Sequence, residues 1–167
     1  GVTVYCRGAW NENNLQRLSL RTVIIDEAWL VPKGHIAEAM ARTQSFSWMG
    51  RVIITSQGGV IGDDFHTLHD STDKRQWCFA CPSCNYVQPW LWEYIRFPED
   101  AKVGGMWDFQ KVEAGTTYEC CNCQTRLKDS PGVRAEANRI DRGACFKPTQ
   151  QASSLGSVGL HWNCLCN

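Results

Sequence analysis

Two pairs of closely spaced cysteines constrain the fold of this chain more than any other feature. Cys81 and Cys84 stand in the stretch CPSC, and Cys120 and Cys123 stand in CCNC. Each C-x-x-C turn, or knuckle, presents two thiolates, and two knuckles complete the sulfur tetrahedron that zinc prefers. We therefore expect these four cysteines to hold a structural zinc ion in a small β-rich zinc-ribbon insertion that has little core of its own.

Neighbouring cysteines leave alternatives open. Cys78 lies three residues before Cys81, so this segment also has the spacing of an iron–sulfur ligand set, although the proline that ends such a motif is absent. Cys121 directly follows Cys120 and crowds it. We favour the zinc set because only that set gives two equal knuckles. The remaining cysteines are expected to be small buried apolar residues: Cys6, Cys145, Cys164 and Cys166.

A second constraint is the stretch VIIDEAW, in which a β-branched run ends in two adjacent carboxylates. The run does not alternate, which predicts a strand of a parallel sheet that is buried on both faces. Ligands of open α/β sheets bind at the carboxyl ends of the strands. Asp26 is expected to hold Mg²⁺ against nucleotide phosphates there, and Glu27 to activate the attacking water, the Walker B pattern. The simpler alternative is a polar strand end that caps the next helix.

The stretch RVIITSQGG predicts a neighbouring buried strand that ends in Thr55, Ser56 and Gln57. Hydroxyl and amide groups at that place can sense the γ-phosphate and relay its loss, whereas the simpler alternative is an ordinary turn at the two glycines. HIAEAMARTQSF between the two strands has helical periodicity. The predicted fold is α/β, part of the parallel sheet of a P-loop ATPase of the RecA-like class.

The phosphate-cradling loop of such an enzyme, GxxxxGK[ST], is absent from this sequence. The chain also begins without Met and stops inside an apolar stretch, so we expect a fragment that binds ATP poorly alone. We divide it into the C-terminal half of an ATPase core (1–65), a zinc ribbon with a leading helix (66–130) and a return to the core (131–167).

Composition adds two limits. Lys plus Arg and Asp plus Glu both number 17, so no overall basic charge indicates nucleic acid, although a local patch can still bind it. No apolar run approaches the ~20 residues that cross a bilayer, which predicts no membrane contact. The aromatic run QPWLWEYIRF either packs inside the ribbon, which we favour, or stacks on bases.

In this order, the motifs resemble the large terminase subunit of tailed phages, of the GpA type. VIIDEA is similar to the Walker B segment of that family, and ITSQGG lies where the family has its coupling motif. DSTDKRQWCFACPSCNYVQPWLWEYIRF is similar to the first knuckle region, YECCNCQTRL to the second, and GACFKPT and GLHWN to the turn and strand that follow. Three positions depart from the family pattern: Gln57 stands where the family commonly has Pro, Cys145 where it usually has Trp, and Asn85 where it commonly has a knuckle Gly.

The resemblance implies a motor that hydrolyses ATP with Mg²⁺ to drive double-stranded DNA into a procapsid, and a separate endonuclease domain. It also implies the host cytoplasm as location and, as partners, a small terminase subunit, the portal and further copies of the motor. Asp26 would hold magnesium, Glu27 would activate water, and Thr55, Ser56 and Gln57 would couple hydrolysis to movement. The four knuckle cysteines would hold zinc structurally.

Two other functions stay open. A helicase-like ATPase of the DExx type with a zinc ribbon would carry a second RecA-like domain with an arginine finger, where a terminase has an acidic nuclease cluster. For a non-catalytic zinc-ribbon module that binds nucleic acid, Asp26→Ala in the full-length parent would leave its biochemistry unchanged. An ATPase with that substitution would lose nucleotide turnover by orders of magnitude.

Overall fold

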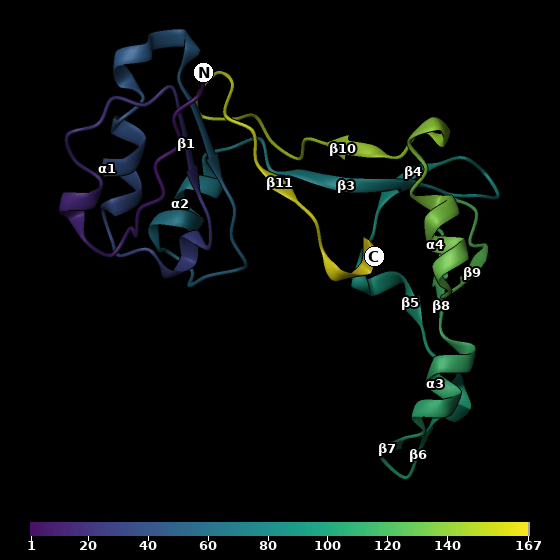
Figure 1. Ribbon diagram of the computed structural model, residues 1–167. Helices are drawn as coiled ribbons and strands as arrows, with labels where there is room; N and C mark the ends of the chain where they lie inside the picture. Colours follow the sequence, from purple (N-terminus) through teal and green to yellow (C-terminus); the bar gives the residue numbers. More distant parts are fainter. Residues whose placement is uncertain (167) are drawn as a thin grey trace. The chain divides into compact units, whose positions relative to one another are not determined.

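The computed structural model describes residues 1–166, which form two compact units, each with its own hydrophobic core (Figure 1). The first unit is Gly1–Ser71, and the second begins at Thr72. The division at 65 and 130 that we drew from the sequence stays a prediction. Each unit is described by itself below.

The first unit contains the expected strand–helix–strand order. Its strands and helices are β1 (Thr22–Ile25), α1 (His35–Ala41), β2 (Arg51–Ile54) and α2 (Asp64–Asp70), with 3-10 turns at Glu12–Asn14, Ala28–Leu30 (η2) and Gln44–Met49. β1 and β2 are parallel, with Val23 opposite Val52 and Ile25 opposite Ile54. The predicted parallel crossover unit is therefore confirmed, and both strands end at the same edge of the sheet.

One face of this sheet is packed and the other is open. Val23 and Ile25 are buried together with Ile36 and Ala39 of α1. Ile24, in contrast, is 68% exposed, and Ile53 is 49% exposed. The prediction that these strands are buried on both faces was therefore wrong within residues 1–166. The strands are apolar on both sides, but the described chain covers only the side that faces α1.

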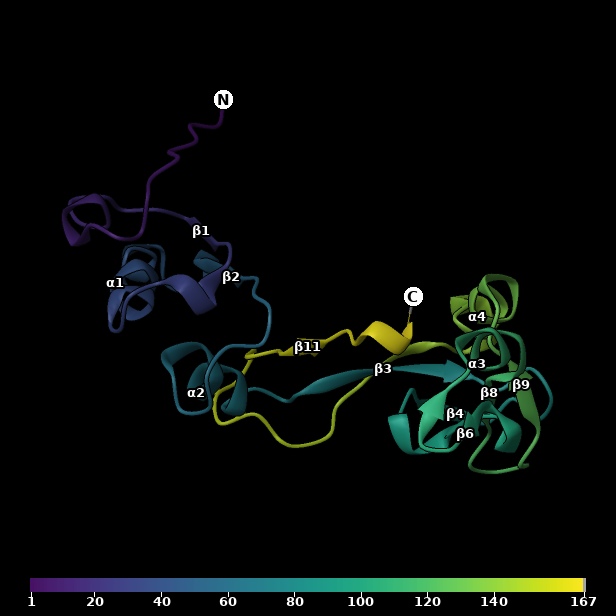
Figure 2. The same ribbon diagram turned by 90° about the horizontal axis from the view of Figure 1, so that it is seen from below.

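The second unit is built around β3. Its main sheet contains β3 (Arg75–Ala80), β4 (Val87–Pro89), β10 (Cys145–Lys147) and β11 (Leu160–His161). Cys78 lies opposite both Cys145 and Pro89, so β10 and β4 lie on opposite edges of β3. β11 pairs with the first residues of β3, on the edge away from β10 (Figure 1). Figure 2 also shows β11 beside β3.

The rest of the second unit is a set of short elements around the knuckles. The strands are β5 (Ile95–Arg96), β6 (Lys102–Val103), β7 (Met106–Trp107), β8 (Thr117–Glu119) and β9 (Arg126–Lys128); the helices are α3 (Phe109–Gly115) and α4 (Pro131–Ala137); 3-10 turns lie at Trp92–Tyr94, Glu99–Ala101, Ile140–Arg142 and Cys164–Cys166. The β-rich ribbon is thus confirmed, but it includes the unpredicted helix α3. No helix in the described chain has the length and apolar character needed to cross a bilayer.

Aromatic rings form the core of the second unit. The Phe79 and Trp90 rings stack with centroids 3.8 Å apart, and Tyr118 meets both edge-on. Trp90 is 3% exposed, which confirms the packing interpretation for this residue. Trp92, in contrast, is 67% exposed, so the packing interpretation does not hold for that residue. The Asn138 side-chain oxygen accepts the Trp90 indole N–H at 3.0 Å, so the buried donor is satisfied.

Candidate functional site

The ends of β1 and β2 bring two predicted site residues into direct contact. Thr55 N–H donates to the carbonyl of Ile25 at 2.8 Å, which extends the parallel pairing by one residue. The Thr55 hydroxyl then donates to Asp26 Oδ1 at 2.5 Å. Because the carboxyl ends of parallel strands lie side by side, two polar residues that follow them are placed within hydrogen-bond reach.

Glu27 turns away from the strand direction. Its backbone is left-handed, with φ 52° and ψ 46°, a conformation that costs a non-glycine residue on the order of 1–3 kcal/mol. The Glu27 N–H donates to Asp26 Oδ1 at 3.0 Å, and Ala28 N–H donates to the Thr55 carbonyl at 3.1 Å. Ala28 is 2% exposed and anchors the turn. The two adjacent carboxylates therefore leave the strand at different angles.

The three residues after β2 have different surroundings. Thr55 contacts Asp26, as described, and Ser56 Oγ accepts the N–H of Trp29 at 3.0 Å. Gln57 is exposed, and within residues 1–166 no hydrogen bond holds its side chain. The structure thus joins Asp26, Glu27, Thr55 and Ser56 in one network and leaves Gln57 outside it. Trp29, which sequence reasoning did not select, belongs to the same network, because its indole N–H donates to Glu27 Oε2 at 2.7 Å.

This edge of the sheet presents oxygen donors to solvent. Asp26, Glu27 and Thr55 are all exposed, so an ion or a phosphate group can reach them. The hydrogen bonds that Glu27 and Thr55 donate to Asp26 both use Oδ1, which leaves Oδ2 available as a ligand. Carboxylate and hydroxyl oxygens are the ligands that Mg²⁺ takes in proteins, so the residues present fit that ion.

The metal centre consists of two knuckles with the same backbone hydrogen bonds. In the first, Cys81 N–H donates to Tyr86 O and Asn85 N–H donates to Cys81 O; in the second, Cys120 N–H donates to Thr125 O and Gln124 N–H donates to Cys120 O. These four distances lie between 2.8 and 3.0 Å. The two turns are therefore equivalent, as the equal spacing of their cysteines predicted.

The four knuckle sulfurs have the spacing of a zinc site. All of the ligand atoms lie within 4.8 Å of one another. The Cys81 and Cys123 sulfurs are 3.8 Å apart, as are those of Cys84 and Cys120. A tetrahedron with Zn–S bonds of about 2.3 Å has edges of about 3.8 Å. The arrangement of the four thiols therefore fits zinc.

The alternative ligands lie elsewhere. Cys78 is buried within β3, and its thiol donates to the Gln76 carbonyl at 3.6 Å. Cys121 is exposed, and its N–H donates to the Gln88 side chain at 2.9 Å. Among the described residues, the four knuckle cysteines are the only group of three or more His, Cys, Asp or Glu side chains whose ligand atoms lie close enough together to share one metal ion. The iron–sulfur alternative is therefore not assembled.

The expectation of burial for the other cysteines was mostly wrong. Cys166 is buried in the aromatic core of the second unit. Cys6, Cys145 and Cys164 are exposed and lie outside both core clusters. Cys145 lies on the short strand β10, which is at the edge of its sheet.

The protonation of the knuckle thiols differs across the centre. Burial raises the pKa of Cys81. The hydrogen bond with the Thr125 hydroxyl lowers the pKa of Cys123. Because zinc takes thiolates, binding must displace protons, and its affinity falls as the pH falls.

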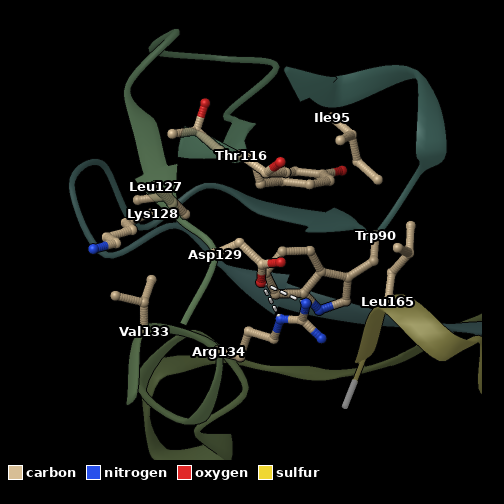
Figure 3. A pocket seen from close by; sticks show the side chains of 11 residues that line it. Trp90, Ile95, Thr116, Leu127, Lys128, Asp129, Val133, Arg134 and Leu165 are labelled. Atoms are coloured by element: carbon tan, nitrogen blue, oxygen red, sulfur yellow. Dashed lines mark hydrogen bonds and ion pairs between the residues drawn. The ribbon is translucent and has the colours of Figure 1, made fainter. Parts of the chain in front are cut away.

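A small pocket lies near the ribbon, in the second unit (Figure 3). It has a volume of about 50 Å³, and its apolar lining includes Trp90, Leu127 and Val133. The ion pair of Arg134 with Asp129 lies at the pocket, with Nε 2.6 Å from Oδ1 (Figure 3). A volume of this size holds only one or two water molecules and cannot take a nucleotide.

Comparison with known proteins gives a match to a family model. Residues 1–142 match the family model described as "Phage terminase large subunit gpA, ATPase domain". Searches among curated proteins and among solved structures gave no match. The matched range contains both the network at the ends of β1 and β2 and all four knuckle cysteines.

Proposed function

The chain belongs to the family of gpA-type ATPase domains of phage terminase large subunits, and on that premise we propose that it is part of the motor that uses ATP hydrolysis to package double-stranded viral DNA into procapsids. The observation that carries the proposal is the hydrogen bond of Thr55 to Asp26. It joins the polar ends of two parallel strands at the edge where nucleotide-hydrolysing sheets bind phosphate.

Asp26 and Glu27 have separate roles in this proposal. Asp26 would hold Mg²⁺ through its carboxylate, and the ion, when bound, would supply positive charge that stabilises the nucleotide phosphates. Glu27 leaves the strand at another angle and accepts the proton of the attacking water. The left-handed backbone of Glu27 supports this division, because it separates two carboxylates that follow each other in the chain.

Thr55, Ser56 and Gln57 form the coupling segment. The Thr55 hydroxyl donates its hydrogen bond to the Asp26 carboxylate, which would hold the ion. A change in charge at the ion after phosphate loss would therefore alter this hydrogen bond. Such a change at a strand end is a common way for nucleotide state to move an attached element. Gln57 is exposed at the end of this segment and is free to meet nucleotide or DNA.

Zinc has a structural role in the proposal. The four knuckle thiolates would complete the coordination shell of a zinc ion and leave no open position for a substrate. The ion would join two knuckles that are distant in the sequence, and it would add its stabilisation to that of the aromatic core in which Cys81 and Cys120 are buried.

The family also supports the wider setting of the proposal. The whole protein would act in the host cytoplasm, bind DNA, a small terminase subunit and the portal, assemble with copies of itself, and carry a separate endonuclease domain. Within this chain, residues 1–65 and 131–167 would belong to the ATPase core and 66–130 to the zinc ribbon. Positive and negative charges are equal in number, so DNA contact would rest on local groups.

Asp26→Asn and Glu27→Gln in the complete gene product test the proposal. Each is expected to lower the rate of ATP hydrolysis by about a hundred-fold or more, with folding and zinc content unchanged. Glu113→Gln, an exposed carboxylate in α3, is the matched control and should hydrolyse ATP like the wild type. Normal turnover in both site variants would overturn the proposal and favour a non-catalytic zinc-ribbon module.

A further inference from the structure

Trp29 makes two hydrogen bonds that connect the proposed base to the neighbouring strand. Its indole N–H donates to Glu27 Oε2 at 2.7 Å, and its backbone N–H donates to Ser56 Oγ at 3.0 Å. We propose that Trp29 is a positioning residue, which fixes the Glu27 carboxylate for water activation and makes that position depend on Ser56. The inference rests on the role of Glu27 in the proposed function.

The indole contact is not forced by burial. Trp29 is 42% exposed, and Glu27 is exposed as well, so water is available to both groups. The short distance and the charge of the acceptor mark a charge-assisted hydrogen bond, which is stronger than one between neutral groups. The indole therefore selects one orientation of a carboxylate that would otherwise rotate freely in solvent.

Holding one carboxylate oxygen has a direct chemical effect. With Oε2 bound to the indole, Oε1 remains to accept a proton from water. An exposed glutamate without this contact samples many rotamers. Fixing one rotamer for catalysis costs conformational entropy, which would raise the activation free energy of each turnover. Trp29 removes that cost in advance because its ring belongs to the same turn, η2, that sets the backbone of Glu27.

The connection to the coupling segment runs through this turn. Ala28 is buried, and its N–H donates to the Thr55 carbonyl at 3.1 Å, next to the bond between Trp29 and Ser56. Two adjacent backbone N–H groups of η2 are thus attached to the end of β2. A shift of Thr55 and Ser56 moves the backbone of Trp29, and with it the indole that holds Glu27.

Replacing one atom of Trp29 tests the positioning role. Benzothienylalanine at position 29 has the shape of tryptophan but carries sulfur in place of the indole N–H. In the complete gene product we expect kcat for ATP hydrolysis to fall by about ten-fold while KM for ATP stays within about two-fold. Trp29→Phe should show the same split. Trp48→Phe, at a tryptophan that is 87% exposed in the same unit, should behave like the wild type.

The connection to Ser56 is tested with a double-mutant cycle. If one network holds the base, Ser56→Ala lowers kcat. The double variant Ser56→Ala/Trp29→Phe should then have a kcat less than about two-fold below that of Ser56→Ala alone. Additive losses would overturn the connection. If the Glu27→Gln protein is inactive but the benzothienylalanine protein has the kcat of the wild type, the positioning role of Trp29 is overturned and the role of Glu27 is not. An active Glu27→Gln protein would instead remove the proposed function of Glu27, and the inference with it.

Discussion

Asn85 and Gln124 occupy the same position in the two knuckles, directly after the second cysteine, and both have left-handed backbone with φ of 58° and 60°. Each N–H donates back to the carbonyl of the first cysteine of its knuckle, at 2.8 Å and 2.9 Å. The closed turn therefore demands a positive φ from whatever residue stands there. Glycine adopts such a backbone without the steric cost that a side chain brings.

Glycine at these positions is expected to stabilise the ribbon. We predict that Gln124→Gly raises the free energy of unfolding by about 1 kcal/mol and that Asn85→Gly raises it less, because asparagine tolerates the left-handed region better than glutamine. Denaturant unfolding of the zinc-loaded protein measures both. Ser83→Gly, inside the first knuckle but without a positive φ, should give no gain. Equal gains from all three variants would contradict this account.

Zinc content should depend on the four knuckle cysteines alone. We predict that Cys84→Ser and Cys123→Ser each reduce bound zinc from about one ion per chain to a small fraction, because three thiolates leave the tetrahedron open. Metal analysis after gel filtration measures the ratio. Cys121→Ser and Cys145→Ser are the matched controls, since both residues are exposed and lie outside the cluster. Zinc loss in the Cys121 variant would mean that the ligand set is different.

Two tryptophans that stand close together in the sequence should differ strongly in their effect on stability. We predict that Trp90→Ala lowers the free energy of unfolding by about 3–5 kcal/mol, because it removes a ring stacked on Phe79 in the core. Trp92→Ala should change it by less than about 0.5 kcal/mol, since that ring is mostly exposed. Chemical denaturation of both variants makes the comparison, and similar losses would argue against the described core.

The cap of α2 gives the first unit a pH dependence at low pH. Asp63 accepts the His66 N–H at 2.6 Å, and this bond holds the pKa of the carboxyl below its ordinary value of 3.8. The charged form is therefore the stabilising one, fully present above about pH 4 and lost as the pH falls through the lower folded-state pKa.

The substitution that isolates this effect is Asp63→Asn, which keeps a capping oxygen and removes the charge. We predict that the thermal midpoint of the wild type falls more than that of the variant between about pH 5 and about pH 2. Parallel slopes for the two proteins would show that the carboxylate does not contribute.

The contact between Asp26 and Thr55 was predictable because it follows from general rules. β-branched runs form strands, parallel strands end at one edge, and polar residues after them meet there. The knuckles were equally accessible, since thiolate spacing is a local property of the chain. The sequence also contained a signal for α3 that we did not use: Asp108 accepts the N–H groups of Gln110 and Lys111 as an N-cap.

Other features depend on conformation that a pattern of residue types does not encode. The left-handed backbone of Glu27 brings Trp29 to its carboxylate, and no propensity predicts that conformation for glutamate. Likewise, the apolar run of β1 does not reveal which face remains exposed. Ile24 and Val23 are chemically similar, and only the position of α1 distinguishes them.

The pairing of β3 sets an order of events for folding. Arg75 at the start of this strand pairs with Leu160, so the sheet cannot close until almost the whole second unit has left the ribosome. The knuckles need only local contacts and can form first. An ion that joins them shortens the loop that β10 and β11 must close, and loop closure is the slow step when partners are distant in sequence. A bound ion would therefore speed the burial of the apolar residues of this sheet in the newly made chain, in addition to stabilising the folded unit.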